Sequence, residues 1–82
     1  MEAISNEDIQ NRLSTRFPGA WIEVNGDGYK YRVTVISKLF AGMSKVKRHQ
    51  NIYAALNDAI ASGALHALSI QALTPEENET ER

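Results

Sequence analysis

Two histidines and a group of basic side chains are the residues of this 82-residue chain that could do chemistry. Lys45, Lys47 and Arg48 directly precede His49, at the start of a segment with helical periodicity. A helix N-terminus has four free backbone N–H groups and about half a positive charge, so basic side chains there cost roughly 0.3–1 kcal/mol each. Because sequences often break such a local rule at functional positions, the pattern indicates an anion-binding site.

The basic residues are concentrated in the middle of the chain. Residues 1–29 have a net charge of −3, residues 30–57 of +6 and residues 58–82 of −4. The middle segment has no acidic residue, and its basic residues are Lys30, Arg32, Lys38, Lys45, Lys47 and Arg48. This split predicts a basic face directed at a partner. A basic helix that is merely offset by acidic ends is an equal alternative.

The composition argues against several classes of protein. The chain has no cysteine, so by itself it offers no disulfide, thiolate nucleophile or thiolate metal ligand. No segment approaches the ~20 apolar residues of a membrane span. The start Met1-Glu2-Ala3-Ile4 lacks the basic residues and apolar run of a secretory signal. We therefore expect one small domain, cytoplasmic and with no membrane contact.

No arrangement of residues indicates an enzyme. The phosphate-loop pattern G-x-x-x-x-G-K-[ST] and the zinc pattern H-E-x-x-H are both absent. The segment Asn25-Gly26-Asp27-Gly28 is too short for a calcium loop and is better explained as a hairpin turn. We expect a binding protein without catalytic residues.

Periodicity and turn signals predict the elements that must position these residues. Ser5, Ser37 and Ser44 are the expected helix N-caps, and Pro18 and Gly63 follow expected helix ends. The predicted elements are a helix over 6–16, strands over 21–24 and 29–36, a helical turn over 38–41, a long helix over 44–62 and a strand over 65–72. Residues 76–82 are predicted to form a disordered acidic tail after a domain over 1–75.

The element order is α-β-β-α-α-β. The first two strands should form an antiparallel hairpin, whereas the last two are joined by a helical crossover of about 28 residues and should be parallel. The prediction is an α+β fold: a single-domain two-layer sandwich with a three-stranded mixed sheet, covered by helices on one face.

The faces of the elements decide how the histidines are used. In the long helix, residues at spacings of three and four are expected to face inward, namely Val46, His49, Tyr53, Leu56 and Ile60, and Ile52, Ala55 and Ala59 are expected to widen this inward face. His49 would then be a packing residue. His66 opens the last strand in phase with its apolar residues, where a lone histidine is more often structural than a ligand. If His49 and His66 came close together, they could instead form a site with two imidazoles.

Four segments carry a resemblance to the BolA-like family. They are Leu39-Phe40-Ala41-Gly42-Met43-Ser44-Lys45-Val46-Lys47-Arg48-His49-Gln50, Tyr53-Ala54-Ala55-Leu56, Leu65-His66-Ala67-Leu68-Ser69-Ile70 and Leu73-Thr74-Pro75-Glu76-Glu77. The resemblance spans about residues 4–77. It implies a fold similar to class II KH domains, in agreement with the element order above.

The resemblance also implies a function. Members of this family pair with monothiol glutaredoxins and share a [2Fe-2S] cluster, in iron–sulfur trafficking or iron sensing. In the family, a histidine in the last strand and a Cys or His in the loop after the first strand carry this role. His66 matches the first position, whereas Lys30 stands near the second and cannot ligate iron while protonated. Thiolates would have to come from the partner.

The family's second described activity is DNA binding by transcriptional regulators linked to stress and cell shape. KH domains grip nucleic acid through a G-x-x-G loop, which here reads Gly42-Met43-Ser44-Lys45 and lacks the second glycine. What remains is the basic set Lys30, Arg32, Lys38, Lys45, Lys47 and Arg48, which could equally dock an acidic protein. A protein-interaction module with no cofactor is a third hypothesis.

Overall fold

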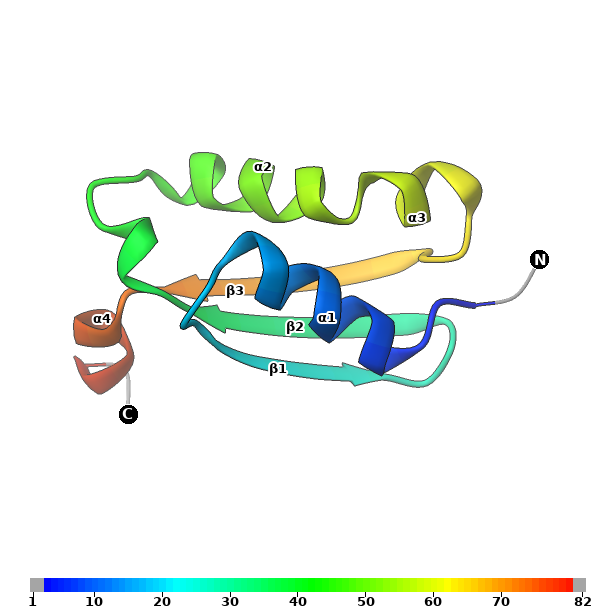
Figure 1. Cartoon of the computed structure of the whole chain (residues 1–82), viewed down its shortest axis with the longest axis horizontal. Helices are drawn as coiled ribbons and strands as arrows, with labels where there is room; N and C mark the ends of the chain where they lie inside the picture. The colour runs from blue at the N-terminus through cyan, green and yellow to red at the C-terminus, as the bar shows by residue number, and fades with distance from the viewer. Residues whose placement is uncertain (1–2, 81–82) are drawn as a thin grey trace.

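The computed structural model describes residues 3–80 as two layers, helices over one face of a sheet (Figure 1). The elements are α1 (Asn6–Arg16), β1 (Trp21–Gly26), β2 (Lys30–Ile36), the 3₁₀ turn η1 (Lys38–Phe40), α2 (Lys45–Ala55), α3 (Asn57–Ser62), β3 (Ala67–Leu73) and α4 (Pro75–Thr80). The sheet order is β1-β2-β3, with β1 antiparallel to β2 and β2 parallel to β3. The predicted α+β class and three-stranded mixed sheet are confirmed.

The first helix forms for the reason that the sequence suggests. The side chain of Ser5 accepts a hydrogen bond of 3.0 Å from the backbone N–H of Asp8, which caps the helix. Ile9, Leu13 and Phe17 recur every four residues and are almost completely buried, so they fasten α1 to the sheet. The predicted helix over 6–16 is confirmed.

The alternation of β2 separates a covered face of the sheet from an open one. Tyr31, Val33 and Val35 are buried beneath the helices, whereas Lys30 and Arg32 are exposed on the other face. The register continues this pattern into β3, where Leu68 pairs with Tyr31, Ile70 with Val33 and Ala72 with Val35. The prediction that Leu68, Ile70 and Ala72 share one face is therefore confirmed. His66, predicted to lie on the same face, is exposed and lies before the first residue of β3.

The long helix predicted over 44–62 is two helices. Leu56 separates α2 from α3 with φ −113° and ψ 11°, and its N–H bonds to the carbonyl oxygen of Tyr53, a tight 3₁₀ contact of 3.1 Å. Leu56 is fully buried. The two helices nevertheless continue in nearly the same direction over the sheet (Figure 1).

The predicted inward stripe on this segment is wrong for three of its members. Val46, Tyr53 and Ile60 are exposed. Ile52, Leu56 and Ala59 are buried as predicted, and Arg48 is buried in addition to them. The predicted inward face is therefore correct for Ile52, Leu56 and Ala59 and wrong for Val46, Tyr53 and Ile60. Packing against α1 and the sheet, which the sequence does not specify, sets this rotation of the segment.

The predicted disordered tail over 76–82 also needs correction. Residues 75–80 form the short helix α4 at the end of β3 (Figure 1), and residues 81 and 82 lie outside the described part of the chain. Its acidic composition suggested disorder. A hydrogen-bonded contact between Glu77 and the start of α2, described below, holds the helix instead.

Gly26 offers a test of the packing between α1 and the hairpin. A Cβ atom at this position would meet Cδ2 of Tyr31 at 2.3 Å and Oδ1 of Asn6 at 2.7 Å. The Tyr31 ring cannot move aside easily, because it is buried and its hydroxyl donates to the carbonyl oxygen of Ile4 at 2.7 Å. Gly26→Ala should lower the free energy of unfolding by about 1–3 kcal/mol.

Urea denaturation measures this effect. Asn25→Ala changes the neighbouring, exposed residue and should stay within about 0.5 kcal/mol of the parent chain. Equal midpoints for Gly26→Ala and the parent chain would contradict the close packing.

Candidate functional site

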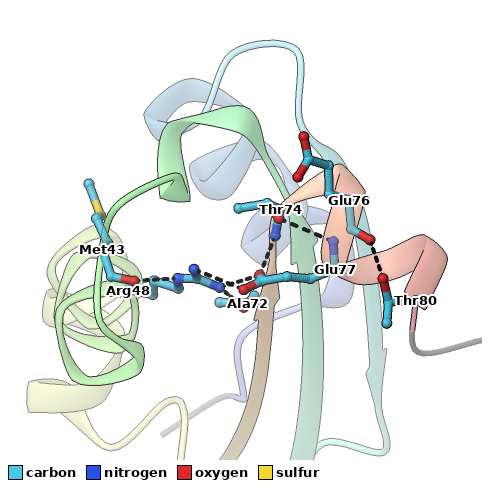
Figure 2. A network of polar contacts seen from close by, with 7 residues as sticks. All are labelled: Met43, Arg48, Ala72, Thr74, Glu76, Glu77 and Thr80. Carbon is cyan, nitrogen blue, oxygen red and sulfur yellow. Dashed lines mark hydrogen bonds and ion pairs between the residues drawn. The ribbon is translucent and has the colours of Figure 1, made fainter.

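Arg48 is a buried cation at the start of α2, with 7% of its surface exposed. Its guanidinium donates to the carbonyl oxygens of Met43 at 3.0 Å and Ala72 at 3.1 Å. It also donates to both carboxylate oxygens of Glu77, at 2.5 and 3.2 Å. Figure 2 shows the side chain reaching across from α2 to the end of β3 and to α4. Arg48 therefore joins the start of α2 to the end of β3 and to α4, whose contacting residues lie 24 and 29 positions further along the chain.

Glu77 is held in place by its own helix. The hydroxyl oxygen of Thr74 accepts the N–H of Glu77 at 3.2 Å, and Oε1 of Glu77 accepts the N–H of Thr74 at 2.8 Å (Figure 2). This is a capping box, and Pro75 occupies the first helical position, where its missing N–H costs nothing. The segment Thr74-Pro75-Glu76-Glu77 thus starts a helix and presents a carboxylate to Arg48.

This contact shifts the protonation of the carboxylate. The hydrogen bond from Arg48, followed by that from the backbone of Thr74, lowers the pKa of Glu77 from 4.5 to about 2. The charged form is therefore stabilised in the folded protein. Its contribution to stability is complete above the ordinary pKa and is lost as the pH falls towards 2.

The anion expected at the start of the long helix is therefore present within the chain itself. It is the carboxylate of Glu77, and it binds Arg48 rather than a free ligand. This corrects the prediction that Arg48 belongs to an exposed docking face with Lys45 and Lys47. The acidic residues of α4 also explain why basic residues are tolerated at the start of α2, since Lys45 lines the same groove as Glu76 and Glu77.

The other predicted basic residues fall into two groups. Lys38 lines a second groove beside Glu76 and Glu77, so Lys38, Lys45 and the exposed Lys47 gather at the end of the molecule where α2 begins. Lys30 and Arg32 lie elsewhere, on the sheet face opposite the helices. The six basic residues of the middle segment consequently do not form one surface.

His66 is exposed and lies one residue before β3. Its ring faces that of Tyr29, with the centroids 5.8 Å apart and the planes inclined at 30°. Gly63, which ends α3 in the left-handed conformation, is also close, since an added Cβ there would be 4.0 Å from Cε1 of His66. The imidazole of His66 therefore has Tyr29 and Gly63 as neighbours and is accessible to a partner.

Tyr29 is the neighbour that the sequence analysis missed. Lys30 pairs with Ala67 in the β2–β3 register, and side chains alternate between faces, so Lys30 points away from the side on which Tyr29 meets His66. The sequence could have identified Tyr29 through strand alternation, because it lies two residues before the inward-facing Tyr31. The residue beside the imidazole is therefore the phenol of Tyr29 and not Lys30, which stands near the position where the family has a Cys or His.

The two histidines do not come together. His49 is half-buried in the second turn of α2, and α2 and α3 run from the Ala72 end of β3 to its His66 end. Fourteen helical residues separate His49 from Gly63, which at 1.5 Å per residue is about 20 Å. Within residues 3–80, no three His, Cys, Asp or Glu residues form a metal-binding group. A site with two imidazoles is therefore not formed.

Comparison with known proteins agrees with the fold and with the family resemblance of the sequence. A family model described as "BolA-like protein" matches residues 5–77. The acid stress protein IbaG of Escherichia coli K12 is 39% identical over 74 residues, covering 90% of this chain and 88% of its own length. The human BolA-like protein 1 is 38% identical over 90% of this chain and 51% of its own length.

Solved structures show the same relationship. A bolA protein homologue from Coxiella burnetii superposes with a TM-score of 0.79 at 30% identity, over 93% of this chain and 97% of that one. The BolA domain of SufE1 from Arabidopsis thaliana gives 0.79 at 34% identity, over 92% and 99%. This chain belongs to the BolA-like family. In the described residues, no helix is long and apolar enough to cross a membrane.

The pKa of Glu77 predicts how stability depends on pH. Above about pH 4.5 the ion pair with Arg48 is complete, and below this pH the melting temperature should fall steeply towards pH 2 as Glu77 takes up a proton. Glu77→Gln should melt at a lower temperature at pH 7 and lose less on acidification, because it has no charge to protonate. Thermal unfolding by circular dichroism at several pH values measures both effects.

Glu79→Gln is the matched control, since it removes an exposed carboxylate from the same helix. Its profile should follow that of the parent chain. If Glu77→Gln and the parent chain had parallel profiles, the ion pair would not contribute to the acid response.

Proposed function

We propose that this chain is a non-enzymatic, cytoplasmic BolA-like adaptor that pairs with a monothiol glutaredoxin in [2Fe-2S] cluster trafficking or iron sensing. The observation that carries the proposal is His66, an exposed imidazole in a chain that belongs to this family. Imidazole nitrogen is an established ligand of [2Fe-2S] iron. The cluster is cargo shared with the partner and not a resident group of this chain.

The surroundings of His66 fit a shared site better than a complete one. His66 is a single exposed imidazole. Among residues 3–80, no group of three His, Cys, Asp or Glu residues could hold a metal ion without a partner. The chain has no cysteine, so any thiolate ligands come from the glutaredoxin. The role of this chain would be to supply one nitrogen ligand and a docking surface.

The loop that places Tyr29 beside His66 also fits a site shared with the glutaredoxin. Asp27 closes it, since Oδ1 of Asp27 accepts the backbone N–H groups of Tyr29 and Lys30, each at 2.8 Å. These bonds hold the ring of Tyr29 beside His66. Tyr29 would orient the imidazole and shield one side of it, while Lys30 stays in solvent and takes no part in ligation.

Visible circular dichroism of a cluster-loaded glutaredoxin tests the proposal. Adding this protein should change the spectrum in the iron–sulfur charge-transfer region, because a nitrogen ligand would enter the coordination of the cluster. His66→Ala should abolish the change. His49→Ala removes the other histidine, about 20 Å away by the helical rise, and should leave it intact.

The outcomes separate two levels of the proposal. No complex and no spectral change with the parent chain would refute the adaptor function. A spectral change that survives in His66→Ala would refute only the assignment of the ligand.

A second function, DNA binding in a regulator of stress response or cell morphology, is favoured by one observation. Lys38, Lys45 and Lys47 are exposed at the same end of the molecule. Three phosphate contacts would give a slope of log K against log salt of about −3 on duplex DNA. Nearby Glu76 and Glu77 oppose such binding, so we rank this function second.

A salt titration of duplex DNA binding distinguishes this alternative. Replacing Lys38, Lys45 and Lys47 together by Ala should abolish binding and its salt dependence if this end is the contact. Replacing Lys30 and Arg32 on the opposite sheet face is the control and should have little effect. Equal affinity for the triple variant and the parent chain would exclude the surface.

A further inference from the structure

An exposed apolar row runs along α2 and α3. Val46 is 67% exposed, Tyr53 44% and Ile60 36%. These residues recur every seven positions, so they lie on one side of the two nearly collinear helices. Aligned apolar residues of this kind, unlike a single exposed one, mark interaction surfaces.

The row faces away from α1. Asn51 accepts a hydrogen bond of 2.5 Å from Arg16 of α1, and Asp58 forms an ion pair with Arg12 of α1. Asn51 and Asp58 each follow a member of the row by five positions, which is about 140° around a helix. Since α1 packs on β1 and α2 on β3, the row lies on the side of the outer edge of β3.

That edge of β3 is unpaired in residues 3–80. The backbone N–H of Ala67 and the carbonyl oxygen of Leu73 bond towards β2 and its extension. Because backbone groups alternate along a strand, those of Leu68, Ile70 and Ala72 point outward. The carbonyl oxygen of Ala72 is bound by Arg48, whereas no such bond within residues 3–80 reaches Leu68 or Ile70. An unpaired edge of this kind can receive another strand.

The row and the edge are aligned with each other. The helices run antiparallel to β3, with Arg48 beside Ala72 and Gly63 beside His66. Tyr53 is five helical residues from Arg48, about 7.5 Å, which corresponds to roughly two residues of a strand. Tyr53 therefore lies at the level of Ile70, so the centre of the row coincides with the centre of the open edge.

This arrangement is self-complementary about a twofold axis at Tyr53 and Ile70. The axis would set Val46 against Ile60 of a second copy, and Leu68 against Ala72 of a second copy. The N–H and C=O of Ile70 both point outward, as is required for a doubly hydrogen-bonded antiparallel pair on the axis. Gln50 and Asn57, the polar residues next to the row, would also meet, and both are uncharged, so no like charges oppose the contact.

We propose that the outer edge of β3 and the row of Val46, Tyr53 and Ile60 form a self-association surface for a second copy of this chain. The two β3 strands pair antiparallel into a six-stranded sheet, and α2 and α3 pack across the axis. One helical row and one short strand are less than the ~800 Å² per partner of a standard interface. We therefore expect a weak dimer that forms only at high protein concentration.

Sedimentation velocity between about 10 µM and 1 mM tests the proposal, the range being set by the small interface. The apparent mass should rise from 9.1 kDa towards twice that value. Tyr53→Glu places two like charges on the axis and should weaken association at least tenfold, on the order of 1.4 kcal/mol. Ala54→Glu is the matched control, since Ala54 is exposed in the same turn but faces about 100° away, and it should associate like the parent chain.

Two further measurements examine the geometry. Amide hydrogen exchange at Leu68 and Ile70 should slow at the high concentration in the parent chain but not in Tyr53→Glu. Because the chain has no cysteine, Tyr53→Cys should crosslink symmetrically on mild oxidation, and faster than Ala54→Cys.

Several results would overturn the proposal. They are a monomer at 1 mM, association unaffected by Tyr53→Glu, unprotected edge amides in the dimer, or equal crosslinking of the two cysteine variants. Loss of glutaredoxin binding in Tyr53→Glu with the parent chain monomeric throughout would assign the surface to that partner instead of a second copy. Because His66→Ala leaves this surface intact, it should not change self-association, so this result is independent of the adaptor function.

Discussion

The contact between Arg48 and Glu77 is the interaction on which the rest of the molecule depends. A buried guanidinium is costly unless its donors are satisfied, and here it binds two carbonyl oxygens and a carboxylate. In doing so it fixes the start of α2 to the end of β3, and it holds α4 against both. The inward rotation of α2 that buries Arg48 is the same rotation that leaves Val46 and Tyr53 in solvent.

The two ends of the molecule differ in their chemistry. At one end, the carboxylate of Glu77 meets the positive start of α2, so the position that resembled a free anion site has an internal partner. At the other end, His66 is exposed beside Tyr29. A chain of this family without cysteine thus offers a stabilised structural end and an accessible imidazole end.

Local signals predicted much of the fold. The capping by Ser5 and Ser44, the hairpin turn and the alternation of Tyr31, Val33 and Val35 depend on neighbouring residues only, and each is present in the structure. The segment Thr74-Pro75-Glu76-Glu77 carries a family motif and also a capping box. Its acidic composition suggested disorder, while a partner 29 residues away along the chain decided the outcome.

The sequence by itself determined the order of helical and strand segments up to β3, the mixed sheet and the family, because turns, caps and periodicity are encoded within a few residues. Only the tertiary structure decided which side of α2 is buried, since packing against α1 and β3 sets its rotation. It also decided that Arg48 is a structural residue and that His49 and His66 lie far apart. Such choices depend on contacts between distant segments, for which a periodic pattern contains no information.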